Sequence, residues 1–266
     1  MRRNKLVYII TVVIILVLSY YINGYLDKQD VNENNTDVSY TPTKYFLPTS
    51  TTGQVIHHKY YSLSYNEKHE QAEWVAYELK KNHLSRNDHN RPYFEIDKAV
   101  KTKAAHWRNY KNSGYSKGHL CPAGDRRFSK FAYNETFLTS NITPQKQDFN
   151  SGIWNTIEQK VRYWAKKHDG VYVVTGGILT NNLSTIGKEE VSVPKYFYKI
   201  VLDNQEGEMK AIAFLIPHKE TNASIYKFVT TIDHIETLTG IDFFPNLDDD
   251  KEMALEASAD FKAWMF

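Results

Sequence analysis

The sequence has almost no cysteine, and this limits how the protein can be built. Its 266 residues include one cysteine, Cys121, so an intrachain disulfide and a cysteine-rich zinc site are both excluded. The fold must therefore be stabilised by its hydrophobic core. Cys121 stands between Leu120 and Pro122, an apolar setting that is typical of a small buried residue rather than of a nucleophile.

The sequence also lacks a strong net charge and any internal repeat. The formal charge is +2, and hydrophobic residues make up 41% of the chain, a composition typical of a globular protein with one domain of ordinary size. The charge is unevenly distributed, because residues 98–130 contain nine Lys or Arg and a single acid, Asp125. A polyanion would be attracted to such a stretch, although a solvated basic surface is the simpler alternative for a charge run alone.

The N-terminal segment lacks the small residues of a signal-peptide cleavage site. Three cations, Arg2, Arg3 and Lys5, precede an apolar run. We predict a cytoplasmic N-terminus at 1–5, an uncleaved transmembrane anchor at 6–26, and a single-pass cell-membrane protein whose catalytic domain is extracytoplasmic. Secretion after signal cleavage is the alternative. A lipoprotein is excluded, because no cysteine stands directly after the apolar segment.

After the anchor, the sequence predicts a flexible polar tether at 27–53 and a single catalytic domain at 54–266. Hydrophobic patterns and turn residues predict the secondary structure of that domain. The resulting mixture of strands and helices, without a regular alternation, indicates an α+β fold with a mainly antiparallel sheet. The expected strands are 60–65, 93–96, 171–179, 196–202 and 210–217, and the expected helices are 71–84, 150–164, 226–238 and 255–264.

The candidate chemistry is concentrated in residues 116–158. His119 follows Gly118, and a glycine permits backbone or substrate to approach the imidazole closely. A neutral imidazole is a natural general base for a water molecule that attacks phosphorus. A structural, hydrogen-bonded histidine is the alternative role, but the surrounding residues favour catalysis at His119.

Asn150 and Glu158 are the predicted metal-binding pair. Hydrolysis of a phosphodiester builds negative charge that a hard cation can stabilise, and Mg²⁺ tolerates few protein ligands when water completes its coordination. We expect Asn150 to bind Mg²⁺ directly and Glu158, eight residues further on, to contact the ion through water. Mn²⁺ shares the preference for oxygen. As alternatives, Asn150 is a helix N-cap and Glu158 an exposed surface residue.

Four basic residues are candidates for contacts with phosphate. Lys117 and Arg91 are expected to hold the phosphate at which reaction occurs, and Arg126 and Arg127 to follow neighbouring phosphates along a strand. Each of them has a solvated surface position as its alternative.

Four segments together resemble one known family. Residues 116–125 read Ser-Lys-Gly-His-Leu-Cys-Pro-Ala-Gly-Asp, and residues 137–145 read Phe-Leu-Thr-Ser-Asn-Ile-Thr-Pro-Gln. Residues 149–158 read Phe-Asn-Ser-Gly-Ile-Trp-Asn-Thr-Ile-Glu, and residues 238–245 read Leu-Thr-Gly-Ile-Asp-Phe-Phe-Pro. They resemble the DNA/RNA non-specific endonucleases, the family of endonuclease G, and the resemblance extends from about His57 to the C-terminus.

The resemblance implies a ββα-metal, or His-Me finger, fold and a role for each matching residue. His119 matches the general base, Asn150 the Mg²⁺ ligand, Glu158 the acid that positions water on the ion, and Arg91 an upstream phosphate-binding arginine. The family commonly has Asp-Arg-Gly-His where this chain has Ser-Lys-Gly-His, so the ammonium group of Lys117 replaces a forked guanidinium. We expect this departure to affect the strength of transition-state stabilisation rather than the reaction.

The predicted function is therefore a Mg²⁺-dependent endonuclease that hydrolyses DNA and RNA without sequence specificity, leaving 5′-phosphate ends. Catalytic roles are assigned to His119, Lys117, Glu158 and Arg91. The expected partners are DNA, RNA and the membrane, and homodimer formation is left open. Two alternatives remain at this stage: an inert nucleic-acid-binding protein that acts in DNA uptake, and a phosphodiesterase for another substrate at the cell envelope.

Overall fold

The structure is a computed structural model that describes residues 11–21, 46–205 and 208–264. The chain divides into two compact units, residues 1–41 and 42–266. In the first unit, residues 11–21 are helical, and the rest of the predicted anchor at 6–26 lies outside the described residues. Within the described ranges, none of the helices has both the length and the apolar character needed to cross a membrane.

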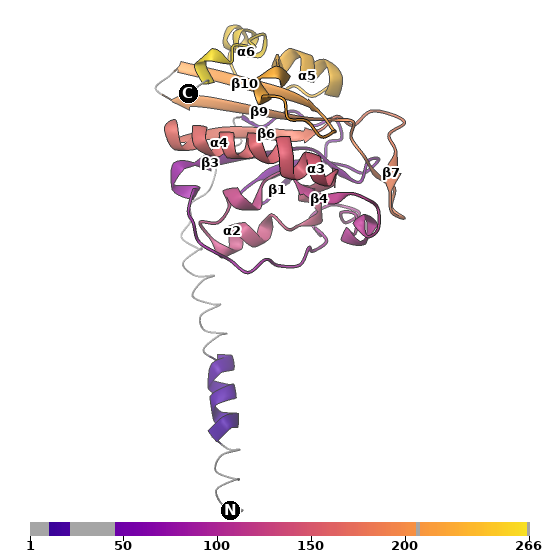
Figure 1. Ribbon diagram of the computed structural model, residues 1–266, viewed down its shortest axis with the longest axis vertical. Helices are drawn as coiled ribbons and strands as arrows, with labels where there is room; N and C mark the ends of the chain where they lie inside the picture. Colours follow the sequence, from indigo (N-terminus) through magenta and orange to yellow (C-terminus); the bar gives the residue numbers. More distant parts are fainter. Residues whose placement is uncertain (1–10, 22–45, 206–207, 265–266) are drawn as a thin grey trace, which may run out of the picture. The chain divides into compact units, whose positions relative to one another are not determined.

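A seven-stranded sheet dominates the second unit (Figure 1). The strand order is β1-β2-β3-β6-β9-β10-β11, and every neighbouring pair is antiparallel. The prediction of a mixed fold with a mainly antiparallel sheet is confirmed. The strands are β1 (Val55–His57), β2 (Ser62–Asn66), β3 (Gln71–Lys80), β6 (Gly170–Gly177), β9 (Tyr196–Gln205), β10 (Glu208–Pro217) and β11 (Val229–Thr230).

Both faces of this sheet are covered. Helix α4 (Asn155–Lys167) packs on one face through Ile157, Val161 and Trp164. A second core on the other face contains residues of α5 (Ile232–Thr239) and α6 (Asp249–Glu256), which lie along β10 in Figure 1. The central strands are therefore buried on both sides and carry hydrophobic residues on both faces, without the alternation of a half-exposed strand.

A second, two-stranded sheet carries the segment predicted to be catalytic. β4 (Ser116–His119) pairs with β5 (Ile142–Gln145), and the chain then continues through α3 (Gln147–Phe149) and a π-helical turn (Asn150–Trp154) into α4. Strand, strand and helix thus form a ββα unit against the large sheet. The remaining elements are α2 (Lys130–Glu135), the hairpin of β7 (Thr185–Ile186) and β8 (Val191–Ser192), and 3₁₀ turns at 81–83, 107–110, 123–125, 139–141, 225–228 and 262–264.

Several predicted elements are wrong in type or position. The segment predicted as a helix at 71–84 is mainly strand β3, and only Glu95 of the expected strand at 93–96 forms a β-bridge, with Leu138. The two C-terminal helices are offset from the expected ranges, since α5 begins after Thr231 and α6 precedes the predicted helix at 255–264.

The tether also ends earlier than expected. Residues 27–45 lie outside the described residues, but Phe46 is buried in the second core. The carbonyl of Thr49 accepts a hydrogen bond of 2.8 Å from the indole nitrogen of Trp74. Residues 46–53 therefore belong to the packed unit rather than to a flexible tether.

Candidate active site

Strand β4 holds His119 in a tightly packed position. His119 pairs with Ile142 of β5, and Ser116 pairs with Gln145. The buried side chain of Gln145 lies over Gly118, so a Cβ atom at residue 118 would lie 2.6 Å from Cγ of Gln145. Only glycine fits beneath this side chain, which explains the glycine that precedes His119.

Two aromatic rings enclose His119. Its imidazole lies 5.5 Å from the ring of Phe94 and 5.0 Å, edge to face, from the ring of Phe137, measured between centroids. Nε2 is buried without a hydrogen-bond partner among the described residues. Burial, with a smaller contribution from the charge of Arg91, lowers the pKa of His119 to about 3. The imidazole is therefore neutral at physiological pH, and Nδ1 is the nitrogen that can reach water.

The ring of Phe94 also brings two of the predicted phosphate-binding residues close to His119. The Lys117 ammonium lies 5.4 Å and the Arg91 guanidinium 5.9 Å from its centroid, and Arg91 lies 5.4 Å from the ring of Phe137. Burial and the charge of Arg91 lower the pKa of Lys117. The structure thus gathers His119, Lys117 and Arg91 around the rings of Phe94 and Phe137. The sequence reasoning gave these two rings no role, although Phe137 opens a quoted segment and Phe94 lies three residues after Arg91.

Asn150 is not a helix N-cap; it follows the last residue of α3 as its C-cap. Its backbone angles, φ −62° and ψ −46°, are helical, whereas an N-cap residue is typically extended. It opens the π-helical turn, in which Gly152 has non-helical angles of φ −93° and ψ −111°. Its amide group is half-buried and forms no hydrogen bond with the part of the chain that the structure describes. A kink at Gly152 therefore interrupts the expected single helix here.

Glu158 is mostly enclosed rather than exposed. Its side chain is 14% exposed, and Nη2 of Arg162 lies 3.4 Å from its Oε2. The same guanidinium donates a hydrogen bond of 2.6 Å from Nε to Oδ1 of Asp125, and the Tyr77 hydroxyl donates to Oδ2 of Asp125 at 3.1 Å. The alternative of an exposed surface residue is therefore wrong for Glu158.

A buried lysine completes this group of charges. Lys199 is fully buried, its ammonium lies 4.6 Å from the ring of Trp154, and it forms no hydrogen bond within the described ranges. Burial raises the pKa of Glu158 to about 7, with Asp125 adding to the increase and Lys199 and Arg162 opposing it. The sequence reasoning gave Asp125 no role, although Asp125 ends the quoted segment 116–125, and it missed Arg162 and Lys199 because nothing in their local sequence distinguishes them.

Arg126 does not lie where a substrate could reach it. It is fully buried, and its Nη2 donates hydrogen bonds to the backbone carbonyls of Tyr60 and Glu78, at 2.9 and 3.1 Å. Its expected role in following phosphates is therefore withdrawn, since these contacts make it a structural residue. Arg127 is exposed, as the prediction requires.

Cys121 is also a structural residue. It is fully buried, and burial raises the pKa of its thiol to about 12. A thiolate is the reactive form of cysteine, so this environment agrees with the expected small buried residue.

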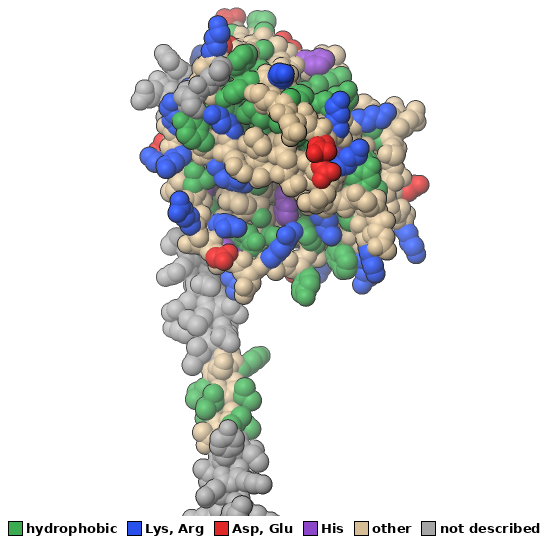
Figure 2. All heavy atoms as spheres, viewed as in Figure 1, with side chains coloured by type: hydrophobic (Ala, Val, Ile, Leu, Met, Phe, Trp, Pro, Cys, Tyr) green, Lys and Arg blue, Asp and Glu red, His purple; other side chains and the backbone are tan. Residues whose placement is uncertain are grey.

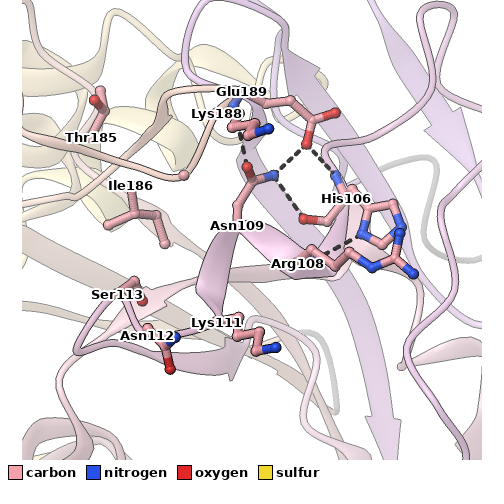
Figure 3. A pocket seen from close by; sticks show the side chains of 11 residues that line it. His106, Arg108, Asn109, Lys111, Asn112, Ser113, Thr185, Ile186, Lys188 and Glu189 are labelled. Atoms are coloured by element: carbon pink, nitrogen blue, oxygen red, sulfur yellow. Dashed lines mark hydrogen bonds between the residues drawn. The ribbon is translucent and has the colours of Figure 1, made fainter.

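A basic pocket of about 780 Å³ lies between residues 106–113 and 185–189 (Figure 3). Arg108, Lys111 and Lys188 contribute its positive charge, while Glu189 is held by the side chain of Asn109. None of the residues with predicted catalytic roles lines it. Figure 2 shows that Lys and Arg are also more widespread than Asp and Glu on the face in view.

The model of a family described as DNA/RNA non-specific endonuclease matches residues 39–250. The chain belongs to this family. The resemblance seen in residues 116–158 is thereby confirmed.

Two curated relatives and one solved structure illustrate the similarity. The mitochondrial nuclease EXOG of Danio rerio is 34% identical over 203 residues, covering 70% of this chain and 59% of the relative. The mitochondrial endonuclease G of Homo sapiens is 30% identical over 220 residues, covering 77% and 73%. A crystal structure of an EndoG/EndoGI complex aligns with a TM-score of 0.68 at 28% identity, covering 73% of this chain and 87% of that one. The chain thus spans about 59% of the length of the EXOG relatives.

The predicted location is corrected by these findings. The relatives are named as mitochondrial nucleases, and no helix in the described part of the chain is long and apolar enough to span a membrane. A single-pass cell-membrane protein with an extracytoplasmic catalytic domain is therefore withdrawn. The membrane as a partner is unsupported. Homodimer formation stays a prediction.

Proposed function

We propose that this protein is a divalent-metal-dependent endonuclease that cleaves both DNA and RNA without sequence specificity. The observation that carries the proposal is the gathering of a neutral His119 with Arg91 and Lys117 around Phe94. A base and two phosphate-binding cations in one place suit the attack of water on a phosphodiester.

In this proposal, His119 accepts the proton of the attacking water. Its Nε2 is enclosed and its pKa is lowered, so Nδ1 is available as an acceptor without prior loss of a proton. The positive charges of Arg91 and Lys117 stabilise the negative charge that builds on the phosphate oxygens. Because the nucleophile is water, no 2′-hydroxyl is needed and both nucleic acids are substrates. Cleavage leaves a 5′-phosphate when the 3′ oxygen departs.

The residues near the π turn fit a hard cation. The amide oxygen of Asn150 accepts no hydrogen bond from a described residue. Glu158, eight positions later, is an enclosed carboxylate. Asn150 would hold Mg²⁺, or Mn²⁺, directly, and Glu158 would contact it through water. When bound, the ion supplies charge stabilisation for the departing 3′ oxygen.

The test compares the full chain with His119→Ala and Asn150→Ala on supercoiled plasmid and on RNA, in Mg²⁺ or in EDTA. We expect both variants to lose roughly 10²-fold to 10⁴-fold in rate and to keep the melting temperature of the parent within a few degrees. His234→Ala is the matched control, because His234 is exposed on α5, and it should cleave normally.

Near-normal cleavage by a folded His119→Ala or Asn150→Ala variant would refute the assignment. Binding of DNA without cleavage of either polymer would favour an inert binding protein instead. Hydrolysis of a small chromogenic diester without cleavage of plasmid or RNA would indicate another substrate.

A further inference from the structure

Five carboxylates gather at the C-terminal end of the second unit. They come from α5, from the loop that follows it, and from α6. Their ligand oxygens fall into two groups of three, and the members of each group lie within 4.8 Å of one another. The groups are Asp233, Glu236 and Glu256, and Asp242, Glu252 and Glu256.

Glu256 belongs to both groups and is the least explained of the five. It is 7% exposed, and its Oε1 is enclosed without a hydrogen-bond partner among the described residues. It is also the last residue of α6, where the helix dipole disfavours negative charge. A buried carboxylate without a partner is costly unless a positive charge compensates for it.

Among the described residues, no ion pair joins any of the five carboxylates to a Lys, Arg or His side chain, and Lys251 of the same helix lies 2.8 Å from Asp248. One contact does orient the cluster, since the backbone N–H of Phe243 donates a 2.9 Å hydrogen bond to Oε1 of Glu236. The arrangement therefore combines concentrated negative charge with an unsatisfied oxygen on Glu256, the residue that both groups share.

The set of ligands suits a calcium ion. In each group the ligand oxygens lie within 4.8 Å of one another, so one ion can contact all three. Ca²⁺ takes six to eight oxygen ligands, among them carboxylates, in a flexible geometry. Mg²⁺ demands near-ideal octahedral geometry, keeps several waters and is usually held by one or two carboxylates, so a cluster of five carboxylates favours Ca²⁺.

We propose that Glu256, with Glu236, Glu252, Asp233 and Asp242, forms a structural Ca²⁺ site that links α5 to α6. The site is separate from Asn150, and the proposal does not depend on the catalytic assignment. Because Ile232, Ile235 and Leu255 of the same helices belong to the second core, an ion between the helices would stabilise their packing on the sheet. Protonation of Glu256 is the competing explanation, since burial and the neighbouring carboxylates raise its pKa to about 8.

The experiment measures thermal unfolding and calorimetric binding of the chelator-treated full chain at about pH 8.5, with CaCl₂ or MgCl₂ as the only divalent salt. At a Ca²⁺ concentration 100-fold above the dissociation constant, we expect the melting temperature to rise by roughly 5–10 °C. Glu256→Gln should lose this rise while remaining folded without Ca²⁺, because it removes one charge from a repulsive cluster. Asp250→Asn, a change at an exposed acid of α6 outside both groups, should keep it.

Two further variants keep the test decisive. Asp242→Asn alters an exposed member of one group and should weaken Ca²⁺ binding even if Glu256→Gln does not fold. Asn150→Ala should leave the Ca²⁺ response intact, which separates this site from the proposed catalytic metal. The proposal is overturned if millimolar Ca²⁺ gives neither heat nor stabilisation, or if the response survives Glu256→Gln and Asp242→Asn.

Discussion

Replacing Gly118 with alanine should disturb the candidate site without removing any of its functional groups. The added Cβ atom would lie 2.6 Å from Cγ of Gln145, whereas ordinary contact begins at 3.4 Å. Oε1 and Cδ of Gln145 would lie closer still, so either the Gln145 side chain or strand β4 must move by roughly 1 Å. Gln145 is fully buried, so much of this displacement should reach His119, the next residue in β4.

The expected magnitude follows from this displacement. Overpacking of a filled interior costs about 1–3 kcal/mol, and in a domain of this size each kcal/mol lowers the melting temperature by about 2–4 °C. A misplacement near 1 Å costs up to about 10²-fold in rate. We expect Gly118→Ala to remain folded and to cleave supercoiled plasmid about 10-fold to 100-fold more slowly than the parent.

A second substitution tests the cause. Gln145→Ala removes the side chain that the new methyl group would strike, and both polar atoms of that side chain lack partners in the described structure, so no hydrogen bond is lost with it. The double variant should regain most of the activity that Gly118→Ala loses. Unchanged activity and melting temperature in Gly118→Ala, or a double variant as slow as the single one, would refute the reasoning.

Burial and Arg91 lower the pKa of His119 to about 3, so below about pH 6.5 the unfolded chain binds a proton that the folded chain does not. The contribution of His119 to folding stability is therefore complete above about pH 6.5 and is lost as the pH falls toward 3. The NMR resonances of the His119 ring should stay constant from about pH 8 to pH 5, and a titration near pH 6.5 would contradict this. Burial of Cys121 should protect it from iodoacetamide in the folded protein, as judged by mass spectrometry, and rapid labelling would count against the structure. Gly176→Ala would place a methyl group against the Glu73 carbonyl and 2.6 Å from the Tyr198 hydroxyl, so circular dichroism should show a clearly lower melting temperature, and an unchanged one would be inconsistent with this packing.

The main error in reading the fold came from strand β3. Residues 71–80 contain Trp74, Val75, Ala76 and Leu79, whose spacing also satisfies a helical pattern. In the structure, Trp74 and Ala76 face one core while Val75 and Leu79 face the other. A strand buried on both faces loses its polar alternation, so periodicity alone does not distinguish it from a buried helix. The strands at 196–202 and 210–217 were predicted correctly, because their dense β-branched and aromatic residues favour a strand.

The last two helices begin at residues other than those predicted. The Thr231 side chain accepts a hydrogen bond from the backbone N–H of His234 and begins α5, whereas the predicted start near Tyr226 falls in a 3₁₀ turn. Helix α6 begins after Asp248, with acidic residues in its first turn. Both signals were present in the sequence, but the prediction gave more weight to apolar residues.

The candidate site was predictable where its parts are neighbours in the chain. His119, Lys117 and Asn150 stand within the quoted segments at 116–158, where residue types together with the family resemblance indicated them, and Arg91 was indicated as the match to an upstream phosphate-binding arginine of the family. The partners of Glu158 were not predictable in this way. Arg162 reaches Asp125, 37 positions earlier, and Lys199 comes from β9 of the large sheet. Only the packing of α4 against that sheet brings these charges together.

The buried charges near Glu158 offer a reason why the proposed metal ligand, Asn150, is a neutral amide. Asp125 and Glu158 carry two negative charges when ionised, and Arg162 and Lys199 carry two positive ones, so the group is balanced without a metal ion. An ion held by Asn150 would keep nearly its full charge, because an amide oxygen neutralises none of it. The charge of the ion would then stabilise the negative charge on the phosphate, together with Arg91 and Lys117 in the proposed reaction. Asn150→Asp should accordingly bind the ion more tightly but cleave more slowly, since the added carboxylate would compete with the phosphate for the same charge.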